Sequence, residues 1–285
     1  MDKVKTFTRK IDAFQRSHTA LAFPVAVVKR YGDEEAGKQA ALVTYYAFLS
    51  VFPLLLIFIT VLGIVVSSNP ELEARITENV FHLFPALSRD LQDNVHTLKS
   101  SGPALALQAL VLLYGARGLA SILQDTFNNL WHIAKEHRPG ILGDYARSFG
   151  MMIAVGLGMI LGSVLSFVLT SVIHLGIIGV IFINLVNVAV TFGLILLVFR
   201  LGTSNKISLK KLILGAGIAT IGLIIVQILG GYIMSEHLPK LEGSYGSFAI
   251  TLGLLFWIYL QAQVLLYAIV TTVVRTEKDW PKKLF

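Results

Sequence analysis

The sequence predicts an all-α, polytopic membrane protein. Only 14% of its 285 residues are Asp, Glu, Lys or Arg, whereas a soluble domain carries roughly 25%. Hydrophobic residues make up 55% of the chain, and they gather in runs near the roughly 20 residues that a helix needs to cross the hydrocarbon core. Low charge together with high hydrophobicity excludes both a soluble domain and an intrinsically disordered chain.

Residues 1–38 are expected to form a cytoplasmic, basic, amphipathic segment. Val4, Phe7, Ile11 and Phe14 recur at helical spacing with basic residues between them, which is typical of a helix lying on a membrane surface. A solvated basic arm is the alternative, because a short isolated helix is marginally stable in water. No apolar stretch with a cleavage site occurs there, so the first span is expected to direct insertion.

Six apolar runs then predict a single transmembrane domain over residues 39–275, followed by a cytoplasmic tail at 276–285. The long loop at 67–102 repeats Leu, Ile and Val three or four residues apart and predicts two outer amphipathic helices, interrupted at Pro85. The expected spans are 40–66, 103–131, 149–174, 177–199, 212–234 and 247–274.

The basic residues predict the orientation. Nineteen of the 24 Lys and Arg residues lie in the N-terminal segment, the C-terminal tail and the two loops on the same side, and four lie in the opposite loops. Cytoplasmic loops carry this excess, so both termini are expected in the cytoplasm. The net charge of +7 is then explained by topology and by the anionic inner leaflet, with no nucleic-acid partner. The remaining basic residue, Arg117, falls inside a span.

The second span carries a polar stripe. At helical spacing, Arg117, Ser121, Gln124 and Asn128 share one face, with Asp125 beside it. Such a stripe has to face other helices or water. One interpretation is a polar cavity that holds an anionic group. The other is that the span ends near Leu123, so that the stripe is its hydrated cytoplasmic end and the Arg117 side chain extends to the membrane surface.

The first span carries Tyr46, Ser50 and Pro53 on one face, with Tyr45 beside them. Pro53 removes one helical hydrogen bond, and interrupted helices form the central sites of many transporters. The alternative is that Pro53 serves helix packing alone. The predicted substrate-binding residues are Arg117, Tyr46, Ser50, Asn128, Gln124, Tyr45 and Asp125, and Pro53 is the predicted conformational hinge.

Small residues predict close helix packing in the third span. Ala154, Gly158, Gly162 and Ser166 recur every four residues, a pattern that lets two membrane helices approach closely. The Gly215-x-Gly217 sequence superficially resembles a dinucleotide loop, but it lies in an apolar helical run with no preceding strand.

Enzymatic motifs are missing from the sequence. It holds no cysteine, which excludes disulfides and thiolate metal sites, and no Walker A, HExxH or GxSxG sequence. We therefore expect no enzyme, no catalytic residue, no metal site and no cofactor, and transport that is not driven by ATP hydrolysis.

Three stretches are similar to one known family. Residues 45–55 read YYAFLSVFPLL and match the pattern YYxxxSxxPLL; Arg117 is followed by FNNLW at 127–131; and YGS at 245–247 precedes Trp257. Together they resemble the YihY/BrkB family over residues 20–275. The resemblance implies a six-helix bacterial inner-membrane protein that moves small solutes or lipid-like molecules; the family also carries an old ribonuclease BN label. Residues 268–270 are Ala-Ile-Val where members commonly have Gly-Ala-Glu.

These observations favour a translocator of a small anionic, zwitterionic or lipid-like solute. Arg117 is expected to supply charge, and Asn128 and Tyr46 are expected to hydrogen-bond the substrate. The alternatives are a non-transporting scaffold or envelope-integrity protein and, more remotely, a membrane-bound ribonuclease. The expected partners are membrane lipids and the substrate, with self-association into a homo-oligomer left open.

Overall fold

A computed structural model describes residues 19–65, 102–172, 176–204, 207–236 and 248–278, and this part of the chain is helical apart from short connections. The all-α prediction is thereby confirmed. Helix α7 begins at Ile141, well before the expected 149, because the helix continues beyond its apolar run with Asp144 in the first turn. The six long helices are α3 (Ala36–Val65), α6 (Gly102–Leu130), α7 (Ile141–Val172), α8 (Gly176–Gly202), α9 (Leu209–Glu236) and α11 (Phe248–Glu277).

The long apolar helices make this a multi-pass membrane protein. Within the described residues, four segments are long and apolar enough to span a bilayer: Leu105–Leu130, Ile178–Gly202, Leu209–Gly230 and Thr251–Glu277. Helices α3 and α7 are of similar length, with 30 and 32 residues. The count of six spans and the cytoplasmic placement of both termini stay predictions.

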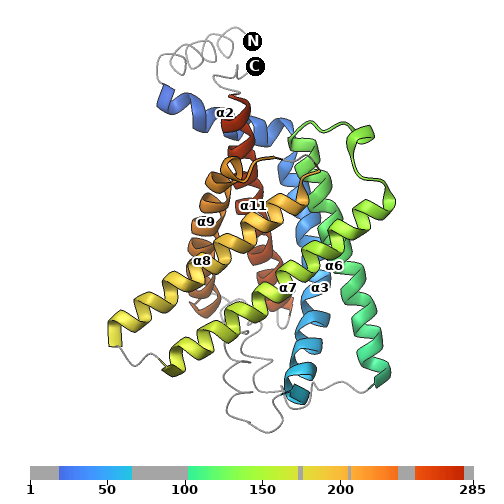
Figure 1. Cartoon of the computed structure of the whole chain (residues 1–285), viewed down its shortest axis with the longest axis vertical. Coiled ribbons are helices and arrows are strands. Elements are labelled where there is room, and N and C mark those ends of the chain that lie inside the picture. The colour runs from blue at the N-terminus through green and yellow to red at the C-terminus, as the bar shows by residue number, and fades with distance from the viewer. Residues whose placement is uncertain (1–18, 66–101, 173–175, 205–206, 237–247, 279–285) are drawn as a thin grey trace.

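Helices α3, α6, α9 and α11 run along the bundle, whereas α7 and α8 form a hairpin that crosses it at a strong tilt (Figure 1). A Cβ built on Gly158 of α7 would lie 2.0 Å from Cδ2 of Leu194 in α8, and one on Gly162 would lie 3.8 Å from Cγ1 of Val190. The absence of a side chain at Gly158 therefore allows the two helices to approach. This confirms, at Gly158, the prediction of close packing by small residues.

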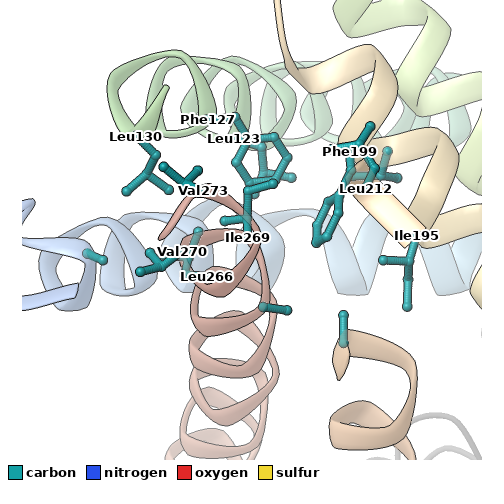
Figure 2. Close-up of a cluster of buried hydrophobic side chains, with 14 of the residues drawn as sticks. Leu123, Phe127, Leu130, Ile195, Phe199, Leu212, Leu266, Ile269, Val270 and Val273 are labelled. Carbon is teal, nitrogen blue, oxygen red and sulfur yellow. The ribbon is translucent and has the colours of Figure 1, made fainter. Parts of the chain in front are cut away.

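The buried core lies at one end of the bundle, where α6, α8, α9 and α11 meet (Figure 2). Phe127 of α6 and Phe199 of α8 pack edge to face, with ring centroids 5.4 Å apart. In its most apolar stretch, 44% of α11 is buried, against 6% for α8. Helix α11 is thus the central helix of the bundle, and α8 is peripheral.

Helix α2 (Thr19–Asp33) lies across this same end of the bundle (Figure 1). Its Tyr31 ring stacks on Tyr267 of α11 at a centroid distance of 3.8 Å, and the Tyr31 hydroxyl donates a hydrogen bond to Oε1 of Gln263. The amphipathic helix predicted around Val4 to Phe14 lies outside the described residues, as do the two helices predicted within 67–102.

The contact between α2 and α11 predicts a loss of stability in alkali. Burial raises the pKa of Tyr31 above its ordinary value, and the nearby Tyr267 and Tyr259 side chains add to the rise. A folded-state pKa above the unfolded value stabilises the fold fully below the unfolded pKa of roughly 10, and the contribution is lost as the pH rises beyond it. We expect the midpoint of thermal unfolding to fall more steeply above this pH in the natural chain than in Tyr31→Phe. Identical pH profiles would contradict this.

Candidate functional site

A cavity of about 420 Å³ lies between the long helices, and all six contribute to its wall. Ligand pockets occupy roughly 300–1,000 Å³, whereas well-packed interiors hold few voids larger than a water molecule. We call this space the central cavity. Its residues are Val43, Ala47, Ser50, Val51, Leu119, Leu123, Val155, Ile195, Val198, Leu223, Gln227, Trp257, Ile258, Gln261, Ala262 and Leu265.

The wall of the central cavity is apolar except for a few groups. Ser50 donates its hydroxyl to the carbonyl oxygen of Tyr46 at 2.8 Å, so that its donor is already used within α3. The amides of Gln227 and Gln261 enter from α9 and α11. Trp257 lies against Gly230, where a Cβ would be 2.4 Å from the indole Nε1. A cavity of this kind suits a largely apolar ligand that is oriented by a few polar contacts.

A second, smaller space of about 220 Å³ lies mainly between α6 and α7, and we call it the α6–α7 cavity. Its wall includes Leu112 and Ala116 of α6 and Met151 and Met152 of α7. It adjoins the central cavity, because the two share part of their walls. The shared residues are Ser50, Leu119, Leu123, Val155 and Val198.

The polar stripe of α6 faces α7 and the connection after α8. The guanidinium carbon of Arg117 lies 4.0 Å from the ring centroid of Tyr145 in α7, and Nε2 of Gln124 donates to Oγ of Ser148 at 2.9 Å. We call these four residues the α6–α7 seam. Farther along, the buried Asn128 accepts a hydrogen bond from the backbone N–H of Ser204 at 2.8 Å. Asn128 thus ties α6 to the connection that follows α8.

Two buried polar atoms of the seam have no partner among the described residues: Nε of Arg117 and Oε1 of Gln124. Arg117 also forms no ion pair with any residue that the structure describes. An unpaired buried donor or acceptor costs about 1–3 kcal/mol, and a charged group costs more. The seam therefore has unused capacity to bind a polar ligand.

The tyrosines of α3 lie against glycines of α6. A Cβ built on Gly118 would be 2.2 Å from Cδ1 of Tyr46, and one on Gly115 would be 2.4 Å from Oγ of Ser50. The Tyr46 ring also lies near those of Tyr45 and Tyr114, with centroids 5.2 and 6.5 Å away. Tyr46 is half-buried and Tyr45 is exposed. These contacts make α3 and α6 a closely packed pair.

Asp125 lies at the exposed end of the stripe. It accepts a hydrogen bond from Nη1 of Arg138 at 3.4 Å, and Nη2 of Arg138 donates to Oδ1 of Asn129 at 2.6 Å. Arg138 follows the short 3-10 helix η2 (Lys135–His137), so these contacts fasten the turn between α6 and α7. Pro53 is buried within α3, which is assigned as one continuous helix through it. Its role as a hinge stays a prediction.

The seven predicted binding residues do not form one cluster. Ser50 alone lines both cavities, and Arg117 and Gln124 lie at the α6–α7 seam. Asn128 and Asp125 hold connecting segments, and Tyr46 and Tyr45 lie at the α3–α6 contact. The prediction did not include Gln227, Gln261 or Trp257 of the central cavity. Both amides are polar residues within apolar runs of the sequence, but only the fold shows that they line the same space. Among the described residues, no three His, Asp or Glu side chains gather as a metal site.

Comparison with known proteins gives a family match over most of the chain. The family described as virulence factor BrkB matches residues 27–283. An uncharacterized protein of Dickeya dadantii is 24% identical over 49% of this chain, which spans only 46% of that protein's length. The inner membrane protein YhjD of Escherichia coli is 23% identical over 98% of this chain and 88% of its own length. A membrane protein of Chromohalobacter salexigens is 23% identical over 84% of this chain and 60% of its own length. No solved structure matches the chain significantly.

Proposed function

The chain belongs to the virulence factor BrkB family of membrane proteins, and from this membership we propose that it translocates a lipid-like, anionic or zwitterionic solute across the inner membrane without ATP. The observation that carries the proposal is the central cavity, which all six long helices line. Membrane transporters bind their substrates at such positions between helices. Its apolar wall favours the lipid-like part of this range.

The tilted hairpin of α7 and α8 supports the same function. The first half of α8 is largely exposed, including Ile181, Phe182 and Leu185. The hairpin packs on the remaining helices mainly through its other half, with Ile195, Val198 and Phe199 buried. Because these α8 side chains are exposed, we expect the hairpin to change its angle to the bundle during transport. Such a movement opens and closes the central cavity from the lipid side.

Filling the central cavity is expected to reduce transport. Ala47 lines the cavity and is half-buried, so Ala47→Phe places a large ring in the space with little disturbance of the core. We expect roughly tenfold slower transport, corresponding to about 1.4 kcal/mol of lost binding. The measurement is movement of a fluorescent phospholipid, and separately of a radiolabelled small anion, in vesicles that contain the purified full chain.

The matched control is Ala189→Phe, which makes the same change on the exposed face of α8 and should leave transport unchanged. A wild-type protein that moves neither probe would contradict the proposed function. Equal slowing by both variants would show that the central cavity is not the path.

A further inference from the structure

Arg117 carries a positive charge that nothing in the described structure neutralises. It lies midway along the candidate span Leu105–Leu130, and the electronegative group beside it among the described residues is the face of the Tyr145 ring. A guanidinium stays charged at any physiological pH. A charged arginine within a span is costly, and a cation over an aromatic face offsets only part of that cost. The seam therefore favours the arrival of an anion.

The groups around Arg117 define the geometry of that anion site. Gln124 lies two helical turns farther along α6 on nearly the same face, and Tyr145 and Ser148 stand opposite on α7. The buried Nε of Arg117 still lacks an acceptor among the described residues. A guanidinium binds the oxygens of a phosphate in pairs, with specific geometry. The site is thus suited to a phosphate group.

An apolar cavity adjoins the α6–α7 seam that contains Arg117. Ala116, which precedes Arg117, lines the α6–α7 cavity, as does Met152, two turns after Tyr145 on the same side of α7. This cavity holds about 220 Å³ and adjoins the central cavity, with which it shares five wall residues. A free phosphate ion would leave this apolar space unfilled, whereas an acyl chain attached to the phosphate would occupy it.

We infer that the α6–α7 seam and its cavity bind a membrane phospholipid with a net negative headgroup. The phosphate lies on Arg117 and beside the Tyr145 ring, and one acyl chain follows the α6–α7 cavity toward the central cavity. The inference deepens the proposed function, on which it rests, because it names the substrate class and the side of the bundle from which the substrate arrives.

The test is lipid binding by the purified full chain, measured by native mass spectrometry without any transport step. The probes are dioleoyl phosphatidylglycerol, dioleoyl phosphatidylcholine and inorganic phosphate. We expect the natural chain to prefer phosphatidylglycerol. Arg117→Gln should weaken that binding about tenfold or more, whereas Arg117→Lys should retain part of it. Lys210→Gln removes a positive charge from an exposed position on α9 and should have no effect.

A second variant distinguishes the contribution of the acyl chain to binding from that of the headgroup. It also keeps the test possible if Arg117→Gln does not fold. Ala116→Phe narrows the α6–α7 cavity beside an unchanged Arg117. It should weaken binding of dioleoyl phosphatidylglycerol about tenfold and leave binding of the short-chain dihexanoyl form unchanged.

Three results would overturn the inference. They are equal binding of both dioleoyl lipids, equal losses in Arg117→Gln and Lys210→Gln, and displacement of phosphatidylglycerol by millimolar inorganic phosphate, which would make this a free-phosphate site. Failure here is distinguishable from failure of the proposed function. If Ala47→Phe slows transport but Arg117→Gln does not weaken lipid binding, only the inference of a phospholipid site is contradicted. If the chain binds the lipid at Arg117 but transports nothing, only the proposed translocation is contradicted.

Discussion

We expect Gly215→Ala to destabilise the protein strongly. A Cβ at Gly215 of α9 would lie 1.9 Å from Oγ1 of Thr272 and 2.9 Å from the backbone oxygen of Ala268, both in α11. A side chain can rotate away, but the backbone of the buried central helix cannot move without disturbing its other contacts. Overpacking of this kind lowers the free energy of unfolding by roughly 1–3 kcal/mol. The measurement is thermal unfolding of the purified chain in detergent.

The same helix supplies the control. A Cβ on Gly217 would meet nothing within 4 Å, so Gly217→Ala should be neutral, or stabilising by up to about 1 kcal/mol through helix propensity. Adding Thr272→Ala to Gly215→Ala should restore part of the lost stability, because it removes the nearest atom and leaves the backbone contact. Equal unfolding temperatures for the two glycine variants would show that α9 and α11 are not packed as described.

The second large effect is expected at Arg30, which joins α2 to two other helices. Its Nη2 donates to the carbonyl oxygen of Leu130 at 3.0 Å and to Nε2 of His132 at 2.6 Å. Its Nε lies 3.2 Å from Oε1 of Glu34, and its Nη2 lies 3.7 Å from Oε2 of Glu277. The side chain is only 6% exposed. Removal of one partner from a buried ion pair costs about 3–5 kcal/mol.

We expect Arg30→Gln to lower the free energy of unfolding by about 3 kcal/mol, near the lower limit of that range because Glu34 and Glu277 are partly exposed. Chemical unfolding monitored by tryptophan fluorescence measures the change, and faster hydrogen exchange in α2 should accompany it. Lys38→Gln is the matched control. It breaks the exposed pair with Glu35 and should cost less than about 1 kcal/mol. A smaller loss in Arg30→Gln than in Lys38→Gln would contradict the proposed role of Arg30 in holding α2.

The helices could be predicted because the bilayer requires long uninterrupted apolar runs, and each expected run is matched by one long helix. The α6 stripe was also predictable, since helical periodicity alone places Arg117 and Gln124 on one face. The sequence left open whether this face lines a cavity or is a wet helix end. The structure places it against α7, with Arg117 on Tyr145 and Gln124 on Ser148. Those partners lie in another helix, so no local pattern identifies them.

The central cavity depends on tertiary structure in the same way. Ser50, Gln227 and Gln261 belong to three helices far apart in the sequence, and only the packing of the bundle brings them to one space. Hydrophobicity and periodicity act along the chain, so the sequence alone determines the membrane class, the all-α fold and the faces of single helices. Cavities and unpaired charges depend on the angles at which helices cross, and those angles arise from contacts such as Gly158 with Leu194 and Gly118 with Tyr46. Interhelical packing therefore decides which polar residues can meet a ligand.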